Sequence, residues 1–226
     1  MDSFIGWGGG KKALRDVIIS NFPKEAPKRY IEVFGGAGWV LFRKEQISGQ
    51  MEVFNDRDSC LINLYRCIKY HPEELKRELD GIFSSRELFY DFKDQCFMRG
   101  MTDIQRAARY FYLIKISFGS KKDTRPKRLD RVMDRFDEIQ KRLSGVIIEN
   151  RDFEDIIRLY DHEDALFYID PPYHTTENYY KTSEGQLFTQ EDHYRLKDLL
   201  DNVKGRFILS YNDDEFIREI YGSYNI

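Results

Sequence analysis

Tyr30-Ile31-Glu32-Val33-Phe34 runs directly into Gly35-Gly36-Ala37-Gly38, and the apolar stretch Trp39-Val40-Leu41-Phe42 follows. The first segment has the aromatic and β-branched residues of a short strand, and the last has the apolar content of a buried helix. The glycines between them permit a tight turn and a close approach of the backbone to a ligand. A strand, a glycine-rich turn and a helix form the first unit of a nucleotide-binding α/β fold, which this stretch therefore predicts.

An acidic residue follows the second predicted strand. Met51-Glu52-Val53-Phe54 ends at Asn55-Asp56, about 20 residues after the glycines, where such folds place the acid that binds ribose hydroxyls. A lone glycine-rich turn is weak evidence, but this spacing favours a cofactor site over a purely structural turn.

Asp170-Pro171-Pro172-Tyr173 follows a third apolar run, 165–169, which has the length of a buried strand. Ligands of open α/β sheets bind at the carboxyl ends of strands. The prolines fix the backbone and donate no hydrogen bonds, so nearby carbonyls can accept bonds from a ligand. Asp170 adds a carboxylate acceptor and Tyr173 a flat aromatic face, which suit an aromatic amine. The alternative is a simple loop-opening turn.

Further strands are predicted at 146–149 and 206–211, and helices at 12–22, 189–204 and 213–221, with Gly205 ending the second of these. Between the sheet segments, 57–145 is charged and mainly helical, with candidate helices at 86–99 and 104–117. Tyr110 and its apolar neighbours in the last of these are predicted core residues.

Trp7-Gly8-Gly9-Gly10-Lys11 precedes the first predicted helix. Three glycines allow the backbone to approach a ligand closely. The alternative is a flexible tail, which the flanking tryptophan and lysine make less attractive.

The composition is that of a globular protein with one main domain. Of 226 residues, 41% are hydrophobic and 33% charged, and the net charge is −3. No apolar run approaches the ~18 residues of a membrane span, and the amino-terminal residues lack the basic and apolar regions typical of a signal peptide, so we expect a cytoplasmic protein. Cys60, Cys67 and Cys96 lack metal-ligand spacing, so we expect buried cysteines and no metal.

One basic segment stands out in this acidic chain. Residues 121–135 contain seven basic and three acidic side chains, and Gly119 and Pro126 indicate a loop in the first part. Any contact with nucleic acid must come from such a local patch. We predict that the loop contacts DNA phosphates, whereas Arg131 and Arg135 fit a charged solvated helix equally well. The predicted DNA-binding residues are Lys121, Lys122, Arg125, Lys127 and Arg128.

Four motifs in order, 7–11, 32–38, 55–56 and 170–173, resemble those of the Dam-type DNA adenine N6-methyltransferases. Val33 stands where many relatives carry proline. The resemblance implies an α/β, Rossmann-like methyltransferase sheet (1–56 and 146–226) with a mainly helical target-recognition insertion (57–145). It also implies that S-adenosyl-L-methionine is the cofactor. The implied cofactor-binding residues are Trp7, Lys11, Glu32, Phe34, Gly35, Gly36, Ala37, Gly38, Asp56, Asp152, Phe153 and Asp170. For Asp152, a helix amino-cap is a compatible alternative.

The implied catalytic residues are Asp170, Pro171, Pro172 and Tyr173. Hydrogen bonds to Asp170 and to the Pro171 carbonyl would hold an adenine amino nitrogen closer to tetrahedral, so that its lone pair faces the methyl donor. The base must be flipped out of double-stranded DNA, and Tyr173 would stack on it.

Three hypotheses remain open at this stage. The preferred one is a site-specific adenine DNA methyltransferase. The second keeps the chemistry but acts on cytosine N4 or on RNA adenine, and the third is a non-methylating dinucleotide-binding domain. The last leaves 170–173 and 7–11 unexplained. We expect a monomer, and neither the target sequence nor a restriction endonuclease partner can be inferred.

The final residues, 224–226, are predicted to begin another strand. Because the related fold closes its sheet with an antiparallel hairpin, we expect that the chain is a truncated or incompletely observed form whose last strands are missing, swapped or disordered. Without them the 207–209 strand would have an open edge.

Overall fold

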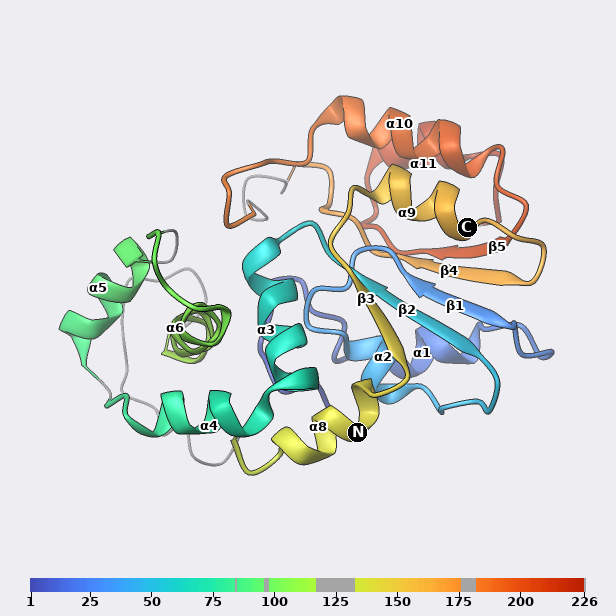
Figure 1. Cartoon of the computed structure of the whole chain (residues 1–226). Helices are drawn as coiled ribbons and strands as arrows, with labels where there is room; N and C mark the ends of the chain where they lie inside the picture. Colours follow the sequence, from blue (N-terminus) through green and yellow to red (C-terminus); the bar gives the residue numbers. More distant parts are fainter. Residues whose placement is uncertain (84, 96–97, 117–132, 176–181, 226) are drawn as a thin grey trace.

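The computed structural model describes residues 1–83, 85–95, 98–116, 133–175 and 182–225. Its centre is a five-stranded sheet with helices on both faces (Figure 1). The strands lie in the order β3-β2-β1-β4-β5, and every neighbouring pair is parallel. Their bounds are β1 Arg29–Glu32, β2 Met51–Asn55, β3 Val146–Glu149, β4 Ala165–Ile169 and β5 Arg206–Leu209. This confirms the predicted α/β, Rossmann-like fold class.

The strand order places a crevice beside β1. From β1 the chain moves outward to β2 and β3, and then returns to the other side of β1 to form β4 and β5. The segments that leave β1 and β4 therefore diverge at their carboxyl ends, and open α/β sheets bind ligands at such a switch point.

Two helical layers cover the sheet, and a further group of helices extends from it (Figure 1). One face carries α9 (Phe153–Tyr160), α10 (Gln190–Leu200) and α11 (Glu215–Tyr221). The other carries α1 (Arg15–Ser20), α2 (Trp39–Arg43), α3 (Ser59–Tyr70) and α8 (Phe136–Leu143), and beyond α3 lie α4 (Pro72–Asp80), α5 (Arg86–Gln95) and α6 (Asp103–Ile116). Among the described residues, no helix has both the length and the apolar character that crossing a membrane requires.

Strand alternation divides the core between the two faces. Ile31 and Val33 pack with the α9–α11 layer, whereas Tyr30 packs with α2, α3 and the helices beyond them. This alternation follows from the two-residue period of a strand. All five residues of β4 are buried, as the continuous apolar run predicts.

A buried ion cluster joins β2 to α8. Arg142 donates two hydrogen bonds to Glu52, of 2.7 and 2.9 Å, and Lys44 Nζ lies 2.5 Å from the same carboxylate. All three residues are buried, so each charge depends on the others. Because α8 leads directly into β3, the cluster fixes the position at which the chain returns to the sheet after the helices.

The structure corrects several predicted boundaries. The first helix begins at Arg15, and α10 ends at Leu200 instead of continuing to Gly205. Gly205 lies in the turn before β5, where a Cβ would come 3.0 Å from the His162 carbonyl oxygen. The predicted final strand is wrong at Tyr224 and Asn225, because the Tyr224 amide closes a turn on the Tyr221 carbonyl.

The predicted DNA-binding loop, with Lys121, Lys122, Arg125, Lys127 and Arg128, lies outside the described residues, as do Arg131 and Cys96. Arg135 is described, and it donates to the Asp2 carbonyl at 2.7 Å and to Glu138 at 3.3 Å. Cys60 and Cys67 are buried, as predicted.

Candidate active site

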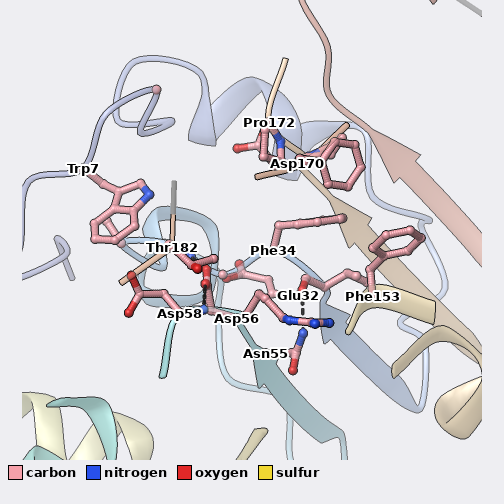
Figure 2. Close-up of a pocket in the computed structure, with 18 of the residues that line it drawn as sticks. Trp7, Glu32, Phe34, Asn55, Asp56, Asp58, Phe153, Asp170, Pro172 and Thr182 are labelled. Atoms are coloured by element: carbon pink, nitrogen blue, oxygen red, sulfur yellow. Dashed lines mark hydrogen bonds between the residues drawn. The ribbon is translucent and has the colours of Figure 1, made fainter. Parts of the chain in front are cut away.

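A cavity of about 670 Å³ lies at the carboxyl ends of β1, β2, β3 and β4. Figure 2 shows Asp170 and Pro172 on one side of it, and Asp56, Asp58 and Thr182 on the opposite side. The four sequence motifs and the Asp152-Phe153 pair all contribute lining residues. Segments far apart in the sequence therefore converge at the switch point of the sheet.

The glycine-rich turn after β1 depends on small residues and on Asp56. A Cβ at Gly35 would lie 2.4 Å from the Phe54 ring, and Gly36 and Gly38 have φ of +50° and +65°. Asp56 accepts hydrogen bonds from the amides of Gly36 and Asp58, both at 2.8 Å. Burial raises the pKa of Asp56 to about 6. Asp56 thus stabilises the turn through these hydrogen bonds. The lone pairs of its carboxylate that remain unused could accept hydrogen bonds from a ligand.

The segment 7–11 forms an ordered turn against the glycine-rich turn. The Gly10 amide donates to the Trp7 carbonyl at 3.1 Å. A Cβ at Gly36 would lie 3.1 Å from Trp7 Cδ1, and one at Gly10 would lie 2.8 Å from Trp39 Nε1. These close approaches explain why both segments contain glycine.

Lys11 reaches from this turn to Asp170. Its Nζ lies 2.6 Å from Asp170 Oδ1 and 4.6 Å from the centroid of the Tyr173 ring, and it donates to the Gly9 carbonyl at 3.1 Å. Burial raises the pKa of Asp170 to about 6, and the Lys11 ammonium limits this rise. Burial opposes the charge of Lys11, but the ion pair more than compensates, so the pKa of Lys11 is raised. At neutral pH the pair is therefore ionised.

Glu32 ends β1 and faces the cavity with only 1% of its surface exposed. Tyr30 Oη donates to Glu32 Oε1 at 2.8 Å. Burial raises the pKa of Glu32 to about 8, against hydrogen bonds that lower it. The carboxyl group is consequently mostly protonated at pH 7.

Three phenylalanines form an aromatic end of the cavity. The Phe34 and Phe153 rings stack with centroids 5.7 Å apart, and Phe188 packs edge-on against Phe34 at 5.7 Å. Asp152 beside them caps α9 through the Glu154 amide at 3.0 Å. Its carboxylate also pairs with Arg57 at 2.6 Å and Arg195 at 3.1 Å. The amino-cap alternative is thus present, and much of the acceptor capacity of Asp152 is already used.

Several lining residues were not predicted as site residues. Tyr110, which was predicted as core, packs against the core and also lines the cavity, and its hydroxyl lies 3.4 Å from Asp58 Oδ2. Asp58 was recognisable in the sequence only as a helix amino-cap, because an aspartate directly before a helix is typical of that position, and the structure shows it capping α3. The others are common loop and helix side chains without a distinctive pattern: Arg57, Thr182, Ser183, Gln186, Leu187, Phe188, Asp192 and Arg195.

The family model of the D12 class N6 adenine-specific DNA methyltransferases matches residues 7–226. The chain belongs to this family. It is 30% identical to the type II methyltransferase M1.LlaDCHI of Lactococcus lactis subsp. cremoris, over 99% of this chain and 85% of that protein. It is 28% identical to the type II methyltransferase M.MjaIII of Methanocaldococcus jannaschii, over 99% and 89%. Its identity to the DNA adenine methylase of Haemophilus influenzae is 24%, over 96% and 82%.

Membership of the D12 class confirms the preferred hypothesis. This N6 adenine methyltransferase transfers a methyl group from a donor to adenine in DNA, and it is not a non-methylating dinucleotide-binding domain.

Proposed function

We propose that S-adenosyl-L-methionine is the methyl donor and that it binds in the cavity at the end of β1. The observation that carries this proposal is the layout of one continuous cavity, with an aromatic end at Phe34, Phe153 and Phe188, a middle lined by carboxyl groups, and the Asp170 ledge. The donor has a matching sequence of groups: an adenine ring, ribose hydroxyls and a cationic sulfonium. About 670 Å³ is an ordinary size for a ligand cavity.

Each donor group has candidate partners on the chain. Phe34 and Phe153 would contact the adenine ring, and Asp56 would accept from the ribose hydroxyls with its remaining lone pairs. The glycine-rich turn would lie against the amino-acid part. The proposed donor-binding set is Trp7, Lys11, Glu32, Phe34, Gly35, Gly36, Ala37, Gly38, Asp56, Asp152, Phe153 and Asp170. All of these line the cavity except Gly38, which stands directly before α2 and shapes the turn.

The target adenine amino group would bind the ledge after β4. Its two N–H groups would donate hydrogen bonds to the Asp170 carboxylate and the Pro171 carbonyl, which turns the nitrogen lone pair toward the methyl donor. Pro171 and Pro172 keep the ledge rigid. Lys11 holds Asp170 ionised, and this is the acceptor form. Once bound, the donor supplies an electrophilic methyl group, and in-line placement of the two reactants supplies much of the rate.

The base must leave the duplex to reach this ledge, and we propose that Tyr173 stacks on it there. The basic loop, 121–128, would hold the phosphates, and the segment 57–145 would recognise the target between the two catalytic portions, 1–56 and 146–226. By analogy with the type II relatives, we propose a role in restriction-modification.

The test compares Asp170→Asn with the wild type. We expect methyl transfer to unmethylated DNA, measured with tritiated donor, to fall roughly 100-fold or more, while the variant still binds S-adenosyl-L-methionine in calorimetry. Asp213→Asn is the matched control, because Asp213 is exposed and pairs with Arg218 away from the cavity. Mass spectrometry of the digested DNA should show N6-methyladenine. Near-normal turnover in Asp170→Asn, or preferential binding of NAD by the wild type, would contradict the proposal.

A further inference from the structure

Three consecutive residues after Asp56 hold the segment that closes one side of the cavity. Arg57 Nε donates to Gln186 Oε1 at 2.8 Å, Asp58 accepts from Ser183, and Ser59 Oγ donates to Glu184. Residues 182–186 therefore dock on the junction between β2 and α3 through contacts with residues 57, 58 and 59.

Asp58 is the centre of this contact. Its carboxylate accepts from the Ser183 amide at 3.0 Å and from Ser183 Oγ at 2.7 Å. It also caps α3 through the Leu61 amide at 2.9 Å. Only 6% of Asp58 is exposed. One buried carboxylate thus joins the end of β2 to the segment after the catalytic ledge, and hydrogen bonds to a charged acceptor are the stronger kind.

The docked segment is a tight turn with its own internal bonds. The Gly185 amide donates to the Thr182 carbonyl at 2.8 Å, and the Thr182 amide donates to the Gln186 carbonyl at 2.9 Å. Thr182 Oγ1 accepts from the Gln186 amide at 3.0 Å. Because these hydrogen bonds hold residues 182–186 together as one unit, anchoring Ser183 also fixes the position of the residues that follow Gln186.

The residues that follow this turn form part of the cavity wall. Leu187 and Phe188 follow directly, both line the cavity, and Phe188 packs against Phe34 and Phe153. The turn that Ser183 anchors therefore leads directly into Phe188, the one of the three phenylalanines that comes from this segment.

We propose that Asp58 is a positioning residue that keeps residues 182–188 closed against the bound methyl donor by holding Ser183. This rests on the proposed function, in which the cavity binds S-adenosyl-L-methionine. Asp58 acts through the turn and not on the reacting atoms. Its loss should accelerate escape of the donor more than it slows the transfer step.

The test measures donor release and steady-state kinetics in Ser183→Ala, which leaves the Asp58 cap of α3 intact. Losing a hydrogen bond to a buried carboxylate should raise the dissociation rate of tritiated S-adenosyl-L-methionine, and its KM, about tenfold. The fall in kcat should be clearly smaller. Ser183→Thr keeps the hydroxyl and should restore most of the affinity. Ser144→Ala is the matched control, because among the described residues the hydrogen bond that Ser144 Oγ makes goes to the Lys141 carbonyl at the end of α8, away from the cavity.

A double-mutant cycle links the effect to Asp58. Asparagine is as good an amino-cap as aspartate, so Asp58→Asn should retain α3 while weakening the bond to Ser183. The double variant should release the donor no faster than the worse single variant. Unchanged release and KM in Ser183→Ala, or additive effects in the double variant, would overturn the inference. Failure of the wild type to bind S-adenosyl-L-methionine would instead overturn the proposed function.

Discussion

Replacing Glu32 by glutamine should stabilise the protein in alkaline solution and have little such effect in acid. Glu32 is 1% exposed, and burial raises its pKa from the usual 4.5 to about 8. In the unfolded chain the carboxyl group ionises freely. As the pH rises above 4.5, ionisation therefore favours the unfolded state until the folded group also loses its proton near pH 8. Glutamine keeps the shape and does not titrate.

The size of the effect follows from the two pKa values. Stability from a group with a raised pKa is fully present below the unfolded value and is lost as the pH rises through the folded value. The loss amounts to about 1.4 kcal/mol per pH unit between the two. With values of 4.5 and about 8, the wild type should lose roughly 3.5 kcal/mol from this group between pH 5 and pH 8. The variant should lose none of it.

Urea unfolding at pH 5 and pH 8, followed by circular dichroism, measures this difference. Other titrating groups are common to both proteins and cancel in the comparison. Glu163→Gln, at an exposed position, is the control and should show the same stability difference at both pH values. If the difference between Glu32→Gln and the wild type is also independent of pH, Glu32 is ionised in the folded protein and the reasoning is refuted.

Three other predictions concern charged side chains. Lys11→Met removes the cation 2.6 Å from Asp170, so the pKa of Asp170 should rise further. The acid limb of the profile of kcat/KM against pH should then move to higher pH. If that limb does not move, Lys11 does not control the pKa of this carboxylate. Arg142→Met leaves Glu52 with Lys44 alone and should lower the free energy of unfolding in urea by about 3–5 kcal/mol. The control, Arg158→Met, breaks an exposed ion pair within a helix and should lower it by about 0.5 kcal/mol or less. Equal losses in the two variants would argue against the buried cluster. Replacing Lys121 and Arg125 together should weaken binding to all DNA sequences and flatten the slope of log K against log salt by about 0.9 per lost contact, and an unchanged slope would make the loop a solvated linker.

The strands and the location of the site were predictable because their signals are local. The apolar run before Asp170 predicts a buried strand, and a strand of a parallel sheet ends where ligands bind. The glycines at 35, 36 and 38 predict the turn because glycine permits conformations that other residues rarely adopt. These features depend on neighbouring residues, so the sequence by itself determined the fold class, the chemistry-bearing motifs and their meeting at one edge of the sheet.

Contacts between distant residues were decided only by the tertiary structure. Nothing near Lys11 in the sequence indicates a pair with Asp170, and nothing near Asp58 indicates Ser183. Periodicity placed Tyr110 on an apolar helix face, but whether such a side chain ends in the core or in a cavity depends on the element opposite it. Glu32 is the clearest case, because its protonation depends on how completely the surrounding elements exclude water. Burial is a property of the packed molecule, and a sequence pattern indicates it only where apolar neighbours repeat.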